Sequence, residues 1–346
     1  MNNLPIVSSL RIKKLFGQHD LSIDFKKLTV IVGKNGMGKT TVLKIINSLI
    51  TGDTPVDYKK IAESVELNFS DGNAICYGIV SNSFVDAIDM NDFTKIILED
   101  KDVINTVGKI LEGMTSISEQ QKKMFVKEFF SAFASQEDIK DKIQTHFSSE
   151  LRKDPDKIIS NKVHLDKFFR STNIRYISTV NISANAGKKM DFGNSIERNL
   201  LDIAIYEELR ILMRKASKSV SEKFMSQLNS FLEESGKIIR RDHGEWVVIT
   251  DSSQRLTLEQ LSSGERQLAY ILATAANTCG KPTLFLMDEP EVSLHLSWQE
   301  KILDAIMNIN PQMQIIAVTH SPGIIMNGHM DAYVEMKDIM QVCGNV

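Results

Sequence analysis

The sequence predicts an α/β fold: a mixed sheet with a parallel core, plus an inserted helical lobe. In the last third of the chain, helical patterns over 264–279 and 297–308 alternate with strand patterns over 283–288 and 313–319. Such alternation is typical of parallel strands joined by crossover helices. Near the N-terminus, an apolar run over 28–32 leads into a glycine-rich segment that opens another helical pattern. We therefore expect a ligand site at the carboxyl ends of parallel strands.

The glycine-rich segment, residues 33–40, reads Gly-Lys-Asn-Gly-Met-Gly-Lys-Thr and matches the phosphate-binding pattern G-x-x-x-x-G-K-[ST]. Its glycines free backbone N–H groups to surround phosphate oxygens at a helix N-terminus, where the helix dipole favours anions. Lys39 is expected to reach the β- and γ-phosphates, and Thr40 to bind Mg²⁺ through its hydroxyl. The alternative is a glycine-rich turn before an ordinary helix. The predicted nucleotide-binding residues are Asn35, Gly36, Met37, Gly38, Lys39, Thr40 and Thr41.

The apolar strand pattern over 283–288 ends in Asp288, Glu289 and Pro290. Apolar residues on both faces suit a buried parallel strand. We expect Asp288 to hold Mg²⁺ through an ordered water, and Glu289 to polarise the water that attacks the γ-phosphate. The alternative is a strand that merely stops at an acidic turn.

A serine-glycine segment, residues 261–265, precedes the helical pattern that follows it. Serine hydroxyls and a glycine at a helix start can form an anion site. The same residues also suit a simple N-cap, with serine as the cap and glutamate in the first turn. Both interpretations stay open at this point. We call residues 261–265 the signature segment.

Together with His320, which follows the strand pattern over 313–319, these motifs resemble the heads of ABC-type ATPases of the AAA family. The similarity is greatest to RecF, the OLD-family nucleases and the Septu-type anti-phage defence ATPases. Residues 289–295, Glu-Pro-Glu-Val-Ser-Leu-His, carry much of it, because transporter subunits usually have Asp-Glu-Pro-Thr-Ser-Ala-Leu-Asp. The resemblance involves both ends of the chain and not residues 84–240. It implies the fold of an ABC-type P-loop NTPase.

The resemblance also implies a composite site in which ATP joins two copies, as a homodimer or a higher homo-oligomer. The signature of one copy would close on the γ-phosphate held by the phosphate loop of the other. Residues 291–295 would lie at the dimer interface, and His320 would contact the γ-phosphate or the attacking water in cis; a structural role is the alternative for His320. The residues that would act in trans are Ser262, Ser263, Gly264 and Glu265. The expected catalytic residues are Lys39, Glu289 and His320, with Thr40 and Asp288 on Mg²⁺.

The sequence departs from the family pattern in three places. Position 263 is serine where glycine is commoner. The glutamine loop that usually links Mg²⁺ to the helical lobe has no clear counterpart, since neither Gln18 nor Asn181 fits it well. Phe16 is the candidate platform for adenine.

The chain is divided into four predicted segments. Residues 1–82 form the N-terminal part of the ATPase core, and 83–172 form the helical insertion. Residues 173–240 form a strand and a helical lobe, and 241–346 complete the core. For the insertion, a docking or sensing surface and simple scaffolding are both open.

Composition limits the partners. The net charge of −3 gives no global signal for nucleic acid, so any such contact needs a local patch. The candidates are Lys122-Lys123, Lys188-Lys189 and Arg240-Arg241, for which solvated surface is the preferred interpretation. We find no signal peptide, no apolar run near the ~20 residues that cross a bilayer, and no metal or disulfide spacing among the three cysteines. A cytoplasmic protein without membrane contact is expected.

The predicted function is a Mg²⁺-dependent, ATP-hydrolysing switch that dimerises, in anti-phage defence or DNA repair. About 25 residues follow His320, which is below a domain's usual size, so we expect a nuclease or other effector to be a separate chain. One alternative is the nucleotide-binding subunit of a membrane transporter. Another is a binding module without turnover, which the presence of Lys39, Asp288 and Glu289 disfavours.

Overall fold

The computed structural model describes residues 6–52, 56–81, 84–85, 88, 144, 147, 158–160, 173–178, 189–191 and 197–343. The chain divides into two compact units, each assembled from separated segments. The first comprises Met1–Phe25, Ser48–Phe169 and Ile339–Val346, and the second comprises Lys26–Asn47 and Arg170–Asp338. The helical insertion predicted at 83–172 lies almost wholly outside the described residues, and the four-part division stays a prediction.

The second unit contains a five-stranded sheet in the order β15-β3-β14-β13-β7, and every neighbouring pair is parallel. Asp288 lies opposite Val318 and Ser178, so the strands end at one edge of the sheet. This arrangement confirms the predicted parallel core. The strands are β3 (Leu28–Val32), β7 (Asn173–Ser178), β13 (Thr283–Asp288), β14 (Met313–Thr319) and β15 (Tyr333–Glu335).

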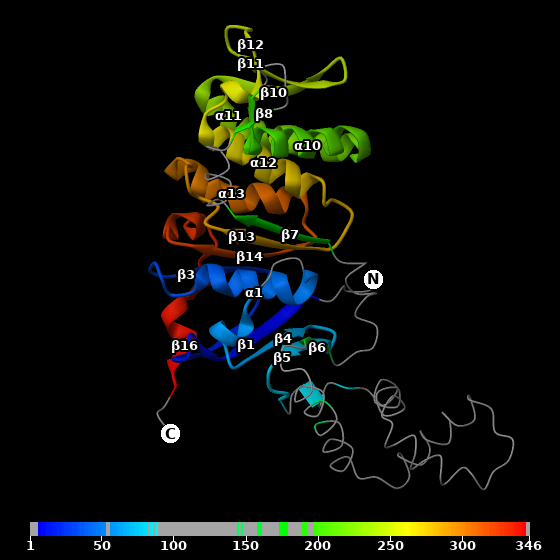
Figure 1. Ribbon diagram of the computed structural model, residues 1–346. Helices are drawn as coiled ribbons and strands as arrows, with labels where there is room; N and C mark the ends of the chain where they lie inside the picture. The colour runs from blue at the N-terminus through cyan, green and yellow to red at the C-terminus, as the bar shows by residue number, and fades with distance from the viewer. Residues whose placement is uncertain are drawn as a thin grey trace, which may run out of the picture. The chain divides into compact units, whose positions relative to one another are not determined.

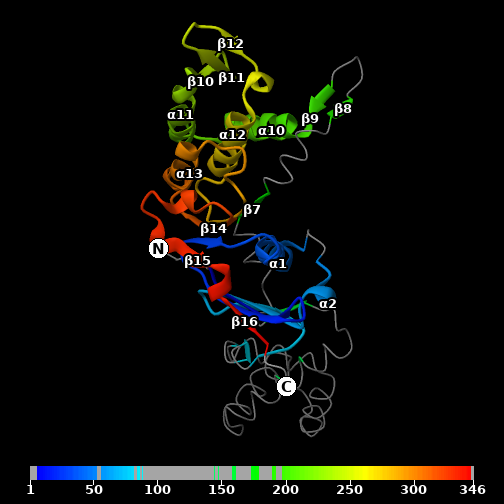
Figure 2. The ribbon, with the colours of Figure 1, turned by 90° about the vertical axis from the view of Figure 1, so that its left-hand side faces the viewer.

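Helices cover both faces of this sheet. Figures 1 and 2 show α12 (Ser263–Ala276) and α13 (Leu296–Ile309) on one face and the start of α1 (Lys39–Thr51) on the other. Every residue of β3, β13 and β14 is accordingly buried. Strands covered on both faces need near-continuous apolar sequence, which explains why 283–288 and 313–319 could be located from sequence alone.

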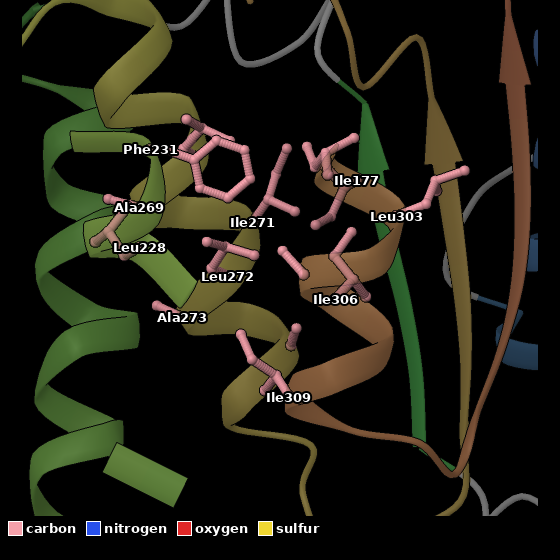
Figure 3. Packing of buried hydrophobic residues seen from close by; sticks show 14 of the residues in the cluster. Ile177, Leu228, Phe231, Ala269, Ile271, Leu272, Ala273, Leu303, Ile306 and Ile309 are labelled. Carbon is pink, nitrogen blue, oxygen red and sulfur yellow. The ribbon is translucent and has the colours of Figure 1, made fainter. Parts of the chain in front are cut away.

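The core of the second unit joins the sheet to layers of helix. In Figure 3, Leu228 and Phe231 of α11 (Lys218–Leu232) face Ile271 and Leu272 of α12, and α12 in turn packs on Ile306 of α13. Burying each such side chain contributes roughly 1.5–3 kcal/mol. Because α12 begins at Ser263, this packing fixes the position of the signature segment.

Two helices lie within the predicted strand and helical lobe over 173–240: α10 (Leu200–Lys215) and α11 (Lys218–Leu232). The break between them falls at Ser217, whose side chain caps α11 by accepting from Val220 N–H. Before α10, β9 (Glu197–Asn199) pairs with β8 (Lys189–Asp191).

A three-stranded antiparallel sheet follows α11: β10 (Lys237–Asp242), β11 (Glu245–Thr250) and β12 (Arg255–Leu256). Trp246 anchors it to the helices, since its ring contacts Phe224 edge to face at 5.3 Å and its Nε1 donates to the Leu209 carbonyl at 3.0 Å. Arg240 and Arg241 lie on β10 with exposed side chains. Lys122, Lys123 and Lys188 lie outside the described residues.

The first unit contains a six-stranded antiparallel sheet in the order β16-β2-β1-β4-β5-β6. Parallel and antiparallel strands therefore form two sheets rather than one mixed sheet. Gly72, with a φ of 82°, lies in the hairpin turn between β4 and β5. The elements are β1 (Val7–Leu15), β2 (His19–Asp24), α2 (Tyr58–Ile61), β4 (Ser64–Phe69), β5 (Ala74–Tyr77), β6 (Ile158–Ser160) and β16 (Met340–Val342).

Short 3₁₀ helices connect several elements: η1 (Glu233–Ser235), η2 (Leu258–Gln260), η3 (Pro322–Ile325), η4 (Met330–Ala332) and η5 (Met336–Asp338). Across the part of the chain that the structure describes, no helix has both the length and the apolar character needed to cross a membrane.

Candidate nucleotide-binding site

The carboxyl ends of three parallel strands gather the predicted catalytic residues within the second unit. The phosphate loop follows β3, Asp288 and Glu289 end β13, and His320 follows β14. These strands are neighbours in the sheet, because β14 pairs with both β3 and β13. Residues nearly 300 positions apart in sequence thus share one edge, which is where open α/β sheets bind ligands.

Lys39 begins α1 and is 4% exposed. Its Nζ donates to the carbonyls of Gly33 at 2.8 Å and Lys34 at 3.1 Å, and lies 3.1 Å from Nε2 of His320. Burial lowers the pKa of the ammonium, and the nearby carboxylates of Glu289 and Asp288 oppose that effect. A cation held by main-chain carbonyls at the mouth of a helix is suited to receive phosphate oxygens.

The loop backbone has the conformations that the glycines predict. Gly36 and Gly38 have φ values of 81° and 90°, a region that other residues rarely adopt. Gly33 is needed for a different reason: a Cβ there would lie 2.8 Å from Cβ of Met336. Among the other predicted binding residues, Asn35 is exposed, and Met37 and Thr41 are half-buried.

Thr40 and Asp288 meet directly. The Thr40 hydroxyl donates to Oδ1 of Asp288 at 2.8 Å, and the Asp288 residue is 1% exposed. A hydroxyl and a carboxylate form the oxygen donor set that Mg²⁺ prefers. The oxygens of the two residues predicted to hold Mg²⁺ therefore lie side by side, and their chemistry suits that cation.

Tyr176 on β7 is a site residue that the sequence motifs missed. Its hydroxyl lies 3.4 Å from Oδ2 of Asp288. Burial raises the pKa of the phenol, and the Asp288 carboxylate raises it further, so the group stays a neutral donor. The available signal was the strand pattern starting at Arg175, once β7 is known to lie beside β13.

Glu289 is held in an unusual conformation. Its φ is 51°, in the left-handed region that costs a non-glycine residue free energy. Its N–H donates to the Val318 carbonyl at 2.8 Å, and its Oε1 lies 2.7 Å from Nε2 of His320. Both side chains are partly exposed, at 20% and 33%. A partly exposed carboxylate beside an imidazole can orient a water and accept its proton.

Glu291 was expected at a dimer interface, but the residue is buried, with only 6% of its surface exposed. Its Oε1 accepts from the Thr319 hydroxyl and from the N–H groups of His320 at 3.2 Å and Ser321 at 3.3 Å. Of the rest of the predicted interface segment, Ser293 and His295 are exposed. His295 is the N-cap of α13, with Nδ1 3.0 Å from the Ser297 hydroxyl.

The signature segment starts α12 with a capping box. The Ser262 hydroxyl accepts from Glu265 N–H at 3.3 Å, and Glu265 Oε2 accepts from Ser262 N–H at 2.7 Å. The N-cap is therefore confirmed, and the anion-site role of the segment stays a prediction. Ser262 and Ser263 are both exposed. Gly264 is buried, and a Cβ there would lie 2.7 Å from the Ser293 carbonyl oxygen.

Glu265 points into its own unit. Its carboxylate accepts from Ser235 Oγ at 2.6 Å and from Lys237 Nζ at 2.9 Å. Burial alone would raise its pKa, but these hydrogen bonds outweigh burial and lower it. Glu265 thus supports the cap of α12, whereas the two serines are the accessible part of the segment.

Gln267, also missed by the motifs, ties α12 to the loop after β13. Its Nε2 donates to the Pro290 carbonyl at 2.7 Å in a fully buried hydrogen bond. Together with the contact of Gly264 on Ser293, this bond holds the loop after β13 against the start of α12.

The proposed adenine platform, Phe16, belongs to the first unit. Phe16 is 43% exposed and adopts a φ of 52°. Its role stays a prediction, as does the glutamine loop: Gln18 lies in the first unit, and Asn181 lies outside the described residues.

Comparisons with known proteins agree with these motifs. Residues 118–327 match a family model described as "AAA domain, putative AbiEii toxin, Type IV TA system". The chain is 25% identical over 334 residues to the Septu protein PtuA of Bacillus thuringiensis, across 92% of this chain and 73% of that protein. It is 26% identical over 155 residues to the Retron Vc95 probable ATPase of Vibrio cholerae serotype O1 biovar El Tor, across 42% of this chain and 27% of that protein.

Among solved structures, the chain aligns with the SMC head domain from Thermotoga maritima, at a TM-score of 0.48 and 15% identity across 98% of this chain and 99% of that chain. An SmcHead bound to the C-winged helix domain of ScpA has a TM-score of 0.48 at 14% identity, across 97% of each chain. The Septu and retron relatives confirm the resemblance to ABC-type ATPases of the Septu kind that the motifs predicted. Because the family match spans more than half of the sequence, the chain belongs to the AAA domain family described as putative AbiEii toxin of type IV toxin–antitoxin systems.

Proposed function

We propose that this protein is a Mg²⁺-dependent ATPase in which two copies enclose ATP, and that this dimer acts as a switch in anti-phage defence. The observation that carries the proposal is the convergence of Lys39, the Thr40–Asp288 pair and the Glu289–His320 pair at one sheet edge. Each of these side chains has a defined part in phosphoryl transfer to water.

The residues divide the chemistry between them. Lys39 and the loop N–H groups would bind the phosphates, and Thr40 and Asp288 would hold Mg²⁺. When bound, the cation would neutralise charge that develops on the phosphate oxygens. Glu289 would orient the attacking water and accept its proton. His320 would hold the Glu289 carboxylate in place, since its Nε2 lies 2.7 Å from that carboxylate.

The exposed serines of the signature segment support the proposed dimer. Ser262 and Ser263 are exposed at the N-terminus of the 14-residue helix α12, where a phosphate oxygen could be bound. In the resemblance to ABC-type heads, these serines act on the nucleotide of the other copy. Glu265 and Gln267, which are buried, would hold them in position.

A mixing experiment tests whether the signature acts in trans. The Lys39→Ala variant lacks a working phosphate loop, and the Ser262→Arg variant lacks a working signature. Each should be inactive alone, whereas a 1:1 mixture should recover about a quarter of wild-type turnover, from one intact site in half of the dimers. Ser263→Arg should behave like Ser262→Arg and leaves the cap of α12 in place. No recovery, with heterodimers verified by native mass spectrometry, would contradict the dimer.

The role in defence and the separate effector rest on the similarity to the Septu protein PtuA and the retron ATPase. When the native host carries the gene with Glu289→Gln, phage should form more plaques on it than when the host carries the wild-type gene. Affinity purification of wild-type protein from that host should co-purify a nuclease or another effector. Equal plaque counts with both genes would contradict the defence role.

A further inference from the structure

We infer that Glu291 is a positioning residue for His320: by holding the backbone of residues 319–321, it sets the place of the imidazole beside Glu289. This inference rests on the proposed ATPase function. It assigns a specific task to a buried carboxylate that the phosphate, Mg²⁺ and water-activating roles leave unused.

The first step is the convergence of three donors on one oxygen. Oε1 of Glu291 accepts from the Thr319 hydroxyl, from His320 N–H at 3.2 Å and from Ser321 N–H at 3.3 Å. The donors come from consecutive residues at the end of β14, 28 to 30 positions further along the chain. Hydrogen bonds to a carboxylate are stronger than neutral ones, so this oxygen defines the path of the backbone.

The second step is that one short loop holds His320 at two points. Glu291 binds its main-chain N–H, while Glu289, two residues earlier, contacts its ring at 2.7 Å. The Leu294 N–H donates to the Glu291 carbonyl at 2.9 Å, which closes the turn that carries this glutamate. A shift of Glu291 would therefore change the distance between the imidazole and the catalytic carboxylate.

The third step concerns the cost of this arrangement. Within the part of the chain that the structure describes, Oε2 of Glu291 is buried without a hydrogen-bond partner. Burial also raises the pKa of the carboxyl group. A buried polar atom without a partner is rare and needs an explanation, and a positioning role at the site supplies one.

Residues 319–321 also have contacts that do not involve Glu291. The Ser321 N–H donates to Oγ1 of Thr319 at 2.8 Å, and the Ser321 hydroxyl donates to Oε1 of Gln299 at 2.8 Å. Removal of the Glu291 carboxylate should therefore loosen this segment while the unit stays folded.

The kinetic test compares Glu291→Ala with His320→Ala and with the double variant. Glu291→Ala should lower kcat about 10- to 100-fold, as expected for a misplaced catalytic group, and leave the Kd of ATP within about twofold. The double variant should be no slower than His320→Ala alone, because residues that act through one another are not additive. Glu291→Gln keeps one acceptor oxygen and should recover part of kcat.

The matched control is Glu234→Gln. Glu234 also accepts from three donors, Ser297, Trp298 and Lys301, and none of them belongs to residues 319–321. This variant should keep the wild-type kcat. An equal loss in Glu234→Gln and Glu291→Gln, or additive losses in the Glu291→Ala/His320→Ala variant, would overturn the positioning role.

A second readout does not need turnover. Amide hydrogen exchange at His320 and Ser321 should be at least about tenfold faster in Glu291→Ala than in wild type, and unchanged in Glu234→Gln. If Glu291→Ala fails to fold, Glu291→Gln carries the same measurement with a smaller increase. Unchanged exchange would overturn the inference. If the wild-type protein does not hydrolyse ATP, the ATPase proposal is refuted. If exchange is nevertheless faster in Glu291→Ala, the contact by which Glu291 positions His320 is still supported.

Discussion

Nε2 of His320 lies 2.7 Å from Oε1 of Glu289, although the two residues leave different strands of the parallel sheet. Lys39 completes the group, with its Nζ 3.1 Å from the same imidazole nitrogen. The imidazole thus lies between a cation and a carboxylate at the sheet edge. This geometry supports an acid–base role for Glu289 and a supporting role for His320.

Glu289→Gln should bind ATP normally and reduce turnover at least about 100-fold, because the amide cannot accept a proton from water. With ATP retained between two copies, the variant should accumulate as a dimer or a larger assembly on a sizing column. Glu300→Gln, on α13, is the matched control and should keep wild-type behaviour. Wild-type turnover in Glu289→Gln would remove the general-base assignment.

Lys39→Ala should abolish nucleotide binding. The substitution removes the ammonium group that lies at the loop carbonyls, and the phosphates of ATP then lack their main positively charged partner. Fluorescent ATP titration would measure the change. Lys34→Ala is the control, because Lys34 is an exposed lysine of the same loop. Unchanged affinity in Lys39→Ala would argue against a phosphate site at residues 33–40.

Gly264→Ala should destabilise the second unit by about 1–3 kcal/mol, since the new Cβ would lie 2.7 Å from the Ser293 carbonyl and force the backbone to shift. Turnover should fall as well, because Ser293 belongs to the loop that carries Glu289. Urea unfolding would measure the loss. Ser263→Ala, one residue earlier and exposed, should change stability little. Equal stability of Gly264→Ala and wild type would show that α12 and the catalytic loop are not tightly packed.

The pH dependence of stability should reveal Glu265. Its folded-state pKa is lowered below its ordinary value of 4.5, because hydrogen bonds from Ser235 and Lys237 outweigh burial. A lowered pKa contributes stability above the unfolded-state value, and this contribution is lost as pH falls through the folded-state value. Glu265→Gln should therefore cost about 1–3 kcal/mol at pH 7. The difference from wild type should shrink below pH 4.5.

Unfolding free energies measured from pH 3 to pH 8 would check this expectation. Glu222→Gln is the control. The Glu222 side chain is 58% exposed, and its Oε1 lies 3.8 Å from Lys218 Nζ in a surface pair that contributes little stability. A difference that is constant with pH would mean that Glu265 is not held as a carboxylate.

The sequence predicted the parallel core closely, and the residues predicted to be catalytic lie together at one edge of it. The strand patterns over 283–288 and 313–319 coincide with β13 and β14, because strands buried on both faces must be apolar throughout. The pattern over 297–308 differs from α13 by one residue at each end. Motif spacing was equally informative, because few sequences can form a phosphate loop or an acidic strand end of this kind.

Contacts between distant segments could not be predicted in the same way. Tyr176 reaches Asp288, and Gln267 reaches Pro290, only because strand order and helix packing bring them together. β16 pairs with β2 through three residues that are largely exposed and carry no periodic pattern. The separation of the antiparallel strands into their own sheet is likewise a property of pairing, which single-strand periodicity does not encode.

The left-handed backbone of Glu289 sets thermal robustness against the proposed chemistry. Glycine would relieve the φ of 51° without steric penalty, and asparagine would tolerate it better than glutamate. Either substitution should therefore lower the local strain, but it would also remove the carboxylate proposed as the general base. A strained glutamate at this position fits the proposed role, because backbone strain is concentrated at functional sites.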